Sequence, residues 1–143
     1  MIYNMEVRQH EDGTYYLECA DLPEMQNSAF ETYEKAHEEA TTVFLNVLEH
    51  EYRRKGRAIP MPEKQPESET VIDVDAVTQC RLLLWNLMQK MDVTASWVSR
   101  RANLSRQEIS RIMDFTASRV HAYKIEEVIH ALGYSVEVTL FEF

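Results

Sequence analysis

The stretch 55–73, KGRAIPMPEKQPESETVID, constrains the fold more than any other part of the sequence. It contains Gly56 and three prolines, at positions 60, 62 and 66, among charged and polar residues. Proline fixes φ and has no amide hydrogen to donate, so such a stretch interrupts helices and central strands. We therefore predict an N-terminal domain at 1–62, a linker at 63–74 and a C-terminal domain at 75–143.

The N-terminal half has the pattern of a small α+β unit. Apolar and polar residues alternate over 2–8 and again over 15–19, and the DG pair between these runs is a hairpin signal. Thr32 can cap a helix over residues 33–52 whose apolar side chains share one face. We expect this helix to pack against the two strands, because each element has one apolar face to bury.

Three helix starts are predicted in the C-terminal half. Asp75, Thr94 and Ser105 can each accept a hydrogen bond from the first turn of a helix, and Glu108 would complete a capping box with Ser105. Asn103 lies between the second and third of these helices, at a turn where asparagine tolerates the left-handed conformation. Two short helices joined by a tight turn are therefore expected here.

A fourth helix and a closing strand are predicted at the end of the chain. The helix runs from about 121 to 132 and Gly133 ends it, whereas residues 134–141, YSVEVTLF, alternate as a strand does. The predicted fold class is α+β, with an N-terminal α/β domain followed by an all-helical domain that carries a terminal strand.

The helix that begins at Ser105 has two chemically different faces. Its apolar residues at 109, 112 and 113 would be buried, and its opposite face suits the DNA major groove, since arginine can pair with guanine and glutamine with adenine. The preceding helix start offers backbone amides to a phosphate. The alternative is a small helical bundle with a solvated polar face. The predicted DNA-binding residues are Thr94, Ser96, Ser105, Arg106, Gln107, Ser110 and Arg111.

Charge is distributed unevenly along the chain, whose net charge is −9. Residues 1–75 contain 17 acidic and 7 basic residues, whereas residues 93–124 contain six basic and two acidic residues. A basic segment suits a polyanion such as DNA, and an acidic domain suits a cationic partner. The asymmetry therefore predicts two surfaces that bind two different partners.

The segment 94–111 resembles the helix-turn-helix of phage repressors through Thr94, Val98, Ile109, Ser110 and Arg111. The whole chain also resembles the HicB antitoxin family. The residues that carry this second resemblance are the motif DGTYYLECADLPEM, the alanine-bearing helix after it, the tail GRAIPMP and the C-terminal LSRQEISRIMD. Departures from these patterns are Ser99 and Asn103 in the helix-turn-helix, and Thr14 and the stretch NSAFET in the N-terminal domain.

The family resemblance implies a fold, two partners and a mode of action. The N-terminal domain would have a partial RNase H-like fold and would bind a small basic HicA-type toxin, an endoribonuclease that cleaves mRNA. The C-terminal domain would bind palindromic operator DNA as a homodimer or a dimer of dimers and repress the protein's own operon. The chain would thus be an antitoxin without enzymatic activity, acting in the cytoplasm.

Two further sets of contacts are predicted. Toxin binding is assigned to Tyr16, Asp21, Leu22, Pro23 and Glu24, although the DLP motif is equally well interpreted as a loop that ends a strand. Dimer contacts are assigned to the apolar face of the terminal strand, which would alternatively cover its own domain. The residues of that face are Val136, Val138 and Leu140.

The sequence contains no pattern that predicts a cofactor site, a metal site or association with a membrane. The two cysteines, Cys19 and Cys80, lie far apart and are interpreted as reduced thiols, and no apolar run is long enough to cross a membrane. Two other functions remain as alternatives. One is a stand-alone dimeric repressor with a ligand-sensing N-terminal domain, and the other is a metal nuclease that uses Glu6, Asp12, Glu18 and Asp21.

Overall fold

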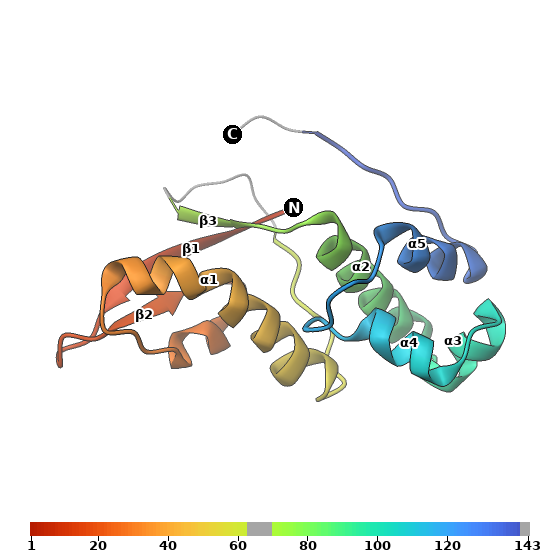
Figure 1. Cartoon of the computed structure of the whole chain (residues 1–143), viewed down its shortest axis with the longest axis horizontal. Helices are drawn as coiled ribbons and strands as arrows, with labels where there is room; N and C mark the ends of the chain where they lie inside the picture. Colours follow the sequence, from red (N-terminus) through yellow and green to blue (C-terminus); the bar gives the residue numbers. More distant parts are fainter. Residues whose placement is uncertain (63–69, 141–143) are drawn as a thin grey trace. The chain divides into compact units, whose positions relative to one another are not determined.

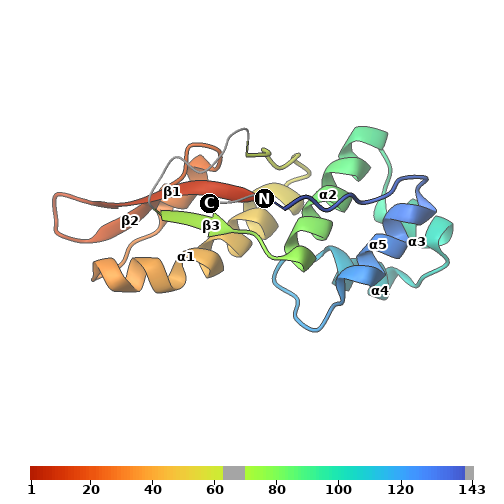
Figure 2. The ribbon, with the colours of Figure 1, turned by 90° about the horizontal axis from the view of Figure 1, so that it is seen from above.

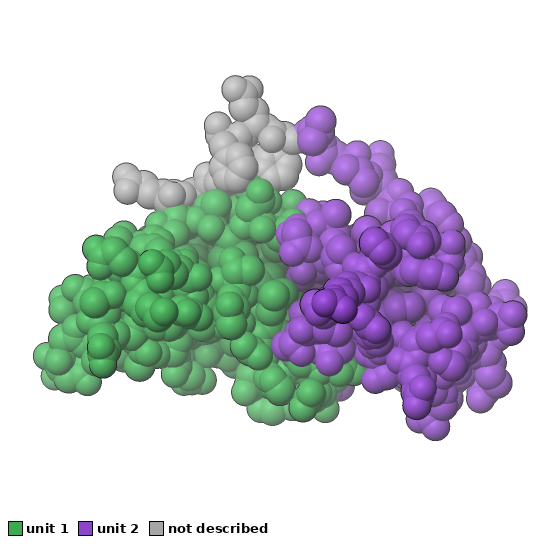
Figure 3. Space-filling view, viewed as in Figure 1, with its two compact units in different colours: residues 1–55, 60–74 green, residues 56–59, 75–143 purple. Residues whose placement is uncertain are grey.

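The structure is a computed structural model that describes residues 1–62 and 70–140 (Figure 1). The chain divides into two compact units (Figure 3). Unit 1 comprises residues 1–55 and 60–74, and unit 2 comprises residues 56–59 and 75–143. One unit combines a small antiparallel sheet with helices and the other is helical, so the predicted mixed α+β class is confirmed.

Unit 1 contains a three-stranded antiparallel sheet with the strand order β2-β1-β3 (Figures 1 and 2). The strands are β1 (Ile2–Gln9), β2 (Tyr15–Glu18) and β3 (Thr70–Asp73). Val7 pairs with Leu17 and Tyr3 pairs with Ile72, so these residues share one face of the sheet. Leu17, Tyr3 and Ile72 are all buried, which makes this face the side of the core.

The turn between β1 and β2 is stabilised by a side-chain contact. Gly13 adopts a φ of 91°, and Thr14 binds the carboxylate of Asp12. Its hydroxyl and its amide donate to Asp12 Oδ1 at 2.6 and 2.9 Å, and these bonds lower the pKa of Asp12. The threonine therefore stabilises the turn that the hairpin signal predicts.

Helix α1 (Tyr33–Val47) covers the apolar face of the sheet. As predicted, Thr32 caps it by accepting a hydrogen bond from the amide of Lys35 at 3.0 Å. The rings of Phe44 and Tyr3 pack with their centroids 5.1 Å apart. The predicted helix over 33–52 changes character after Val47, because Leu48–Arg53 forms the π-helical segment η2, while Pro23–Asn27 forms the 3-10 segment η1 after β2.

The predicted linker at 63–74 differs from what the structure shows. Residues 63–69 lie outside the described part of the chain, but Thr70–Asp73 forms β3 and pairs with β1 along Ile2–Met5. The physical reason is that β1 would otherwise keep an unpaired edge, and Ile72 supplies a buried side chain next to Tyr3. A four-residue strand beside a proline-rich, charged stretch gives too little alternation to be recognised from sequence.

Residues 56–59 belong to unit 2, whereas the sequence predicts them in the domain 1–62. They are held against α2 (Ala76–Met91) by side chains of that helix. The indole of Trp85 donates to the carbonyl of Arg57 at 2.8 Å, and Asn86 forms two 2.8 Å hydrogen bonds with the backbone of Ile59. The chain therefore passes between the units three times, after residues 55, 59 and 74.

The described part of unit 2, up to residue 140, contains four helices, and their starts are those predicted. Asp75, Thr94 and Ser105 cap α2, α3 (Ala95–Ala102) and α4 (Arg106–Met113), each by accepting a hydrogen bond from an amide in the first turn. Helix α5 (Ala122–Ala131) ends just before Gly133, whose φ is 89°. The fully buried side chains of this unit include Leu82, Leu84, Met88, Val98, Ile109 and Ile125.

The predicted closing strand at 134–141 is wrong for the residues that the structure describes. Residues 134–140 have no regular secondary structure, and residue 141 lies outside the described range. The side chains of Val138 and Leu140 are 86% and 95% exposed. A strand requires a partner for its backbone hydrogen bonds, and residues 134–140 have no strand partner among the described residues of this single chain.

Both thiols are free and buried, and burial raises the pKa of Cys19 and of Cys80. In the unfolded chain a cysteine thiol ionises at about pH 8.5, whereas in the folded protein the thiols of Cys19 and Cys80 ionise at higher pH. The unfolded state therefore loses protons first, and we expect the free energy of unfolding to fall as the pH rises above about 8.5. Urea titrations at pH 7 to 9.5 test this, with the double variant Cys19→Ala, Cys80→Ala showing a shallower fall. A stability that rises over this range would contradict it.

Candidate functional site

Helices α3 and α4 form a compact pair joined by a tight turn. Asn103 occupies the left-handed region with a φ of 55°, as the sequence predicts, and its amide bonds the carbonyls of Ser99 and Arg100. The Ser105 hydroxyl then accepts from the amide of Glu108 at 3.1 Å and starts α4. Asparagine and the small Ser99 side chain, which is buried here, are thus compatible with the geometry of the turn.

The two faces of α4 are separated as predicted. Ile109, Ile112 and Met113 are buried, and together they attach the helix to unit 2. The opposite face has no described element over it, since its four polar side chains are exposed: Arg106, Gln107, Ser110 and Arg111. One of them is restrained, because Arg111 donates to the carbonyl of Ser118 at 3.1 Å. The face thus offers two guanidinium groups, an amide and a hydroxyl on one rigid helix.

The other predicted DNA-binding residues lie at helix starts. Thr94 is exposed and its hydroxyl accepts from the amide of Trp97 at 3.2 Å, while Ser96 is half-buried and its carbonyl accepts from the hydroxyl of Ser99. The main role of the Thr94 and Ser105 hydroxyls is therefore to cap the N-termini of α3 and α4. Each can still donate its hydroxyl hydrogen outward, because a capping hydroxyl uses only acceptor capacity.

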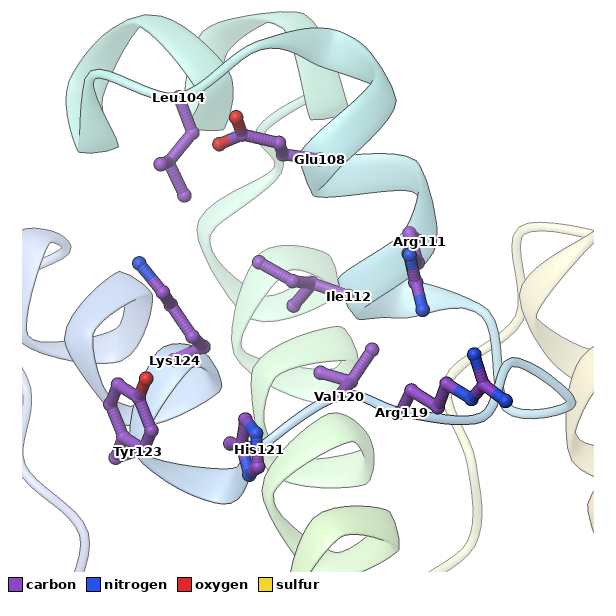
Figure 4. Close-up of a pocket in the computed structure, with 9 residues that line it drawn as sticks. All are labelled: Leu104, Glu108, Arg111, Ile112, Arg119, Val120, His121, Tyr123 and Lys124. Carbon is purple, nitrogen blue, oxygen red and sulfur yellow. The ribbon is translucent and has the colours of Figure 1, made fainter.

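Three basic residues that were not predicted as DNA contacts lie beside α4 in the structure: Arg119, His121 and Lys124. A hollow of about 310 Å³ lies between α4, the loop that follows it and the start of α5 (Figure 4). Its floor is apolar, with Ile112 and Val120. Its other lining residues include Arg111, Arg119, His121, Tyr123 and Lys124. The positive charge of the segment 93–124 is the only sequence signal for this site.

A buried arginine in α2 holds the end of α4. Arg81 is 3% exposed, and its Nε donates to the carbonyl of Ile112 at 2.8 Å. Carbonyls in the last turn of a helix have no partner within that helix, and a cation near them is also favoured by the helix dipole. Arg81 therefore fixes the position of α4 in unit 2.

Replacing Arg81 by methionine should lower the free energy of unfolding by about 2–3 kcal/mol, because a buried hydrogen bond to a charged donor is lost. Arg101→Met is a matched control, since Arg101 donates from its Nε to the last carbonyl of α5, at Ala131, but is exposed. The control should cost less than about 0.5 kcal/mol. Equal losses in chemical denaturation of the two variants would contradict the assigned role of Arg81.

The predicted toxin-contact residues differ in how exposed their side chains are. Leu22 is fully buried, which excludes it from direct contact and makes the DLP segment partly structural. Glu24 accepts a 2.6 Å hydrogen bond from the hydroxyl of Tyr52, which ties η1 to η2. Pro23 is exposed, whereas Asp21 and Tyr16 are half-buried, and Tyr16 stacks on His10 with 4.3 Å between ring centroids.

The described basic side chains of unit 1 form ion pairs with carboxylates of the same unit, and the unit has more carboxylates than basic groups. Each of its five described bases forms an ion pair within the unit: Arg8, Lys35, Arg53, Arg54 and Lys55. Among the described residues, the exposed carboxylates of Glu11, Glu31 and Glu34 have no cationic partner. This surface can attract a cationic molecule without first breaking its internal ion pairs.

The described part of the chain gives no support for metal chemistry or for a membrane span. Over residues 1–62 and 70–140 no three His, Cys, Asp or Glu side chains are grouped so that they could hold an ion. The carboxylates of Glu6 and Glu18 are instead bound to Arg8, at 2.5 and 3.1 Å. In the same ranges, none of the helices has the length and apolarity needed to traverse a bilayer.

Comparison with known proteins gives consistent matches. A family model described as the HicB-like antitoxin of bacterial toxin–antitoxin systems matches residues 2–83. The antitoxin HicB of Pseudomonas fluorescens is 33% identical over 131 residues, covering 91% of this chain and 85% of that protein. The antitoxin HicB of Escherichia coli K12 is 27% identical over 143 residues, covering 98% and 99%. Antitoxin HicB 1 of Photorhabdus laumondii is 25% identical over 143 residues, covering 98% and 87%.

These matches agree with the motifs in unit 1 and extend through unit 2. The family model covers more than half of the chain, and the similar proteins span nearly all of it. The resemblance to HicB predicted from the sequence is thereby confirmed, and so is the prediction that the protein is not an enzyme. The chain belongs to the HicB-like antitoxins of bacterial toxin–antitoxin systems.

Proposed function

We propose that this antitoxin neutralises a small HicA-type endoribonuclease through unit 1 and represses its own operon through unit 2. The antitoxin half of the proposal rests on the family match over residues 2–83. The repressor half rests on one observation above all, the four exposed polar side chains of α4 on a helix that α2 and α3 hold in place. We expect the protein to act in the cytoplasm, where it would meet both proposed partners.

Charge and topology support toxin binding by unit 1. Three antiparallel strands covered by α1 are compatible with a partial RNase H-like fold. The uncompensated carboxylates of unit 1 suit a toxin that binds RNA. Carboxylates and RNA phosphates would both bind the cationic groups of the toxin and would compete for them. Within the predicted contact, Tyr16, Asp21, Pro23 and Glu24 remain candidates for the surface that covers the toxin's RNA site.

The geometry of α3 and α4 supports a helix-turn-helix. We assign α4 as the recognition helix in the major groove, where Arg106 and Gln107 read base edges and Ser110 permits close approach. Thr94 and Ser96 lie at the start of α3, whose backbone amides would bind a phosphate. In this assignment α2 is the supporting helix and Arg81 sets the angle at which α4 enters the groove.

A dimer would supply the partner that residues 134–140 lack. The segment alternates apolar and polar residues, and Val138 and Leu140 are almost fully exposed. Pairing with the same segment of a second copy would satisfy the backbone hydrogen bonds and bury Val136, Val138 and Leu140. A two-fold dimer matches a palindromic operator with one α4 for each half-site.

The first experiment is intact-mass analysis of the complex that copurifies with the tagged protein expressed from its native locus. A stoichiometric small basic polypeptide would identify the toxin and support the antitoxin mechanism. Recovery of the protein alone, still bound to DNA, would contradict toxin binding and favour a stand-alone repressor. Recovery of the toxin complex with no affinity for its own promoter DNA would contradict the repressor half.

The dimer contact predicts a specific variant. Val138→Asp places a charge in the proposed intermolecular sheet, so we expect the native mass to fall by half and operator affinity to drop at least about 100-fold. Glu137→Asp, in the neighbouring position, is the control and should leave the mass unchanged. Native mass spectrometry and operator titration measure both. A dimer that persists in Val138→Asp would place the dimer contact elsewhere.

A further inference from the structure

The hollow between α4 and α5 is lined by cationic side chains from α4, from the loop after it and from α5. Arg111 and Arg119 lie on one side of it, and Tyr123 and Lys124 lie on the other (Figure 4). Ile112 and Val120 form the floor between these two sides. Glu108 is the only acidic residue of the lining, and it lies near Leu104 at the end away from Arg119. The site therefore has two separate cationic flanks and an apolar middle.

The basic side chains of the hollow are accessible. Arg111, Arg119, His121, Tyr123 and Lys124 are all exposed. Lys124 is only loosely paired, with 3.9 Å between its Nζ and Glu127 Oε2. Arg111 donates to the Ser118 carbonyl with one nitrogen, which leaves other guanidinium donors for a ligand. An anion can thus reach the flanks without displacing a buried interaction.

The backbone at Arg119 supports a role for its side chain. Its φ of 60° lies in the left-handed region, where glycine is unstrained and an arginine is not. Packing does not demand an arginine there, because the side chain is exposed. The sequence nevertheless places a guanidinium at this position, on the rim of the hollow.

We propose that this hollow binds two neighbouring phosphate groups and the apolar group between them, as the backbone of one nucleic-acid strand presents them. One phosphate contacts Arg119 and Arg111, the other contacts Lys124 and the Tyr123 hydroxyl, and the sugar lies over Val120. The amides at the start of α5, whose N-cap His121 makes no side-chain capping bond, add donors for the second phosphate. Such contacts fix the register of α4 without reading sequence.

The assignment of these two phosphates to DNA rests on the proposed operator binding. A free diphosphate compound would present the same pair of phosphate groups to the hollow. Two measurements on the full-length protein separate these sources. The first is the dependence of operator affinity on salt, because each phosphate contact contributes about 0.9 to the slope of log K against log salt. The second is an NMR titration of the DNA-free protein with inorganic pyrophosphate.

We expect Arg119→Gln and Lys124→Gln each to lower the salt slope of the operator-bound dimer by about two, because each of its two protomers loses one phosphate contact, and to weaken specific and nonspecific DNA binding equally. Arg119→Gly should lower the slope similarly while its melting temperature stays level or rises, since it relieves the left-handed strain. A purely structural role of Arg119 would not separate stability from affinity in this way. Arg100→Gln, an exposed site at the end of α3 outside the hollow, is the control of equal charge change.

Each result decides the proposal. Lower slopes confined to the hollow variants support it with DNA as the source. Unchanged slopes together with pyrophosphate shifts confined to residues 119–124 support the phosphate site with a small ligand as the source. Unchanged slopes and no pyrophosphate shifts overturn it. If the wild-type protein binds no DNA at all, the repressor assignment fails, and the pyrophosphate titration still tests the hollow.

Discussion

The double variant Arg106→Ala, Gln107→Ala should lose operator binding while it still neutralises the toxin. Each bidentate contact of arginine to guanine or of glutamine to adenine contributes about 1–3 kcal/mol of discrimination. Losing both contacts therefore costs about 2–6 kcal/mol for each half-site. A dimer loses them twice, at least about 4 kcal/mol in all, so the fall in specific affinity should be about 1,000-fold or more.

The measurement is a titration of native promoter DNA and of a scrambled duplex at one salt concentration, beside a toxin inhibition assay. The fold itself should be unaffected, because both side chains are exposed and the cap at Ser105 stays in place. Arg100→Ala is the matched control and should leave specific affinity within about threefold, since it removes a similar charge outside the reading face.

Two outcomes would contradict the assignment. Unchanged operator affinity in the double variant would exclude α4 as the recognition helix. Simultaneous loss of DNA binding and of toxin neutralisation, with the melting temperature preserved, would show that one surface serves both partners. The distribution of charge argues against that second outcome, because unit 1 has a surplus of acidic residues, whereas the segment 93–124 has a surplus of basic ones.

Arg53→Met should destabilise unit 1 by about 2–4 kcal/mol. The carboxylate of Glu49 is fully buried in η2, and Arg53 binds both of its oxygens, with 2.6 Å between Arg53 Nε and Oε1. Arg54 also binds it, with 2.9 Å between Arg54 Nε and Oε2. Removing one partner of a buried ion pair leaves charge that water cannot solvate, which costs about 3–5 kcal/mol. The remaining Arg54 contact reduces that cost.

A pair in the same segment with the same spacing provides the control. Lys55 binds Glu51 at 2.6 Å four residues away, as Arg53 binds Glu49, but both side chains are partly exposed. Lys55→Met should therefore change the free energy of unfolding by less than about 1 kcal/mol. Urea denaturation of the full-length chain, followed by a probe in unit 1, compares the variants. Equal losses in the two would show that burial of Glu49 does not matter.

Local features of the fold follow from the sequence because they depend on neighbouring residues. A cap such as Thr32 or Ser105 binds an amide three residues away, and the structure contains each predicted cap. The left-handed turn at Asn103 and the separation of the α4 faces are local in the same sense. The candidate DNA-binding face was therefore predictable residue by residue.

Features that join distant segments were not predictable. Strand β3 exists because β1, nearly seventy residues earlier, offers an edge, and residues 56–59 dock because Trp85 and Asn86 bind their backbone. The burial of Leu22 also depends on distant packing, which changes its role from a predicted toxin contact to a core residue. Short segments with weak alternation acquire structure only from such partners.

The sequence by itself determined where helices start, which of their faces are apolar and how charge is distributed along the chain. Only the tertiary structure decided which charged groups are buried, as with Glu49 and Arg81, and which basic side chains surround a common hollow. It also decided that residues 134–140 have no strand partner among the described residues of this chain. The physical reason is that caps and alternation act over a few residues, whereas burial and pairing are set by whatever distant segment supplies the other side.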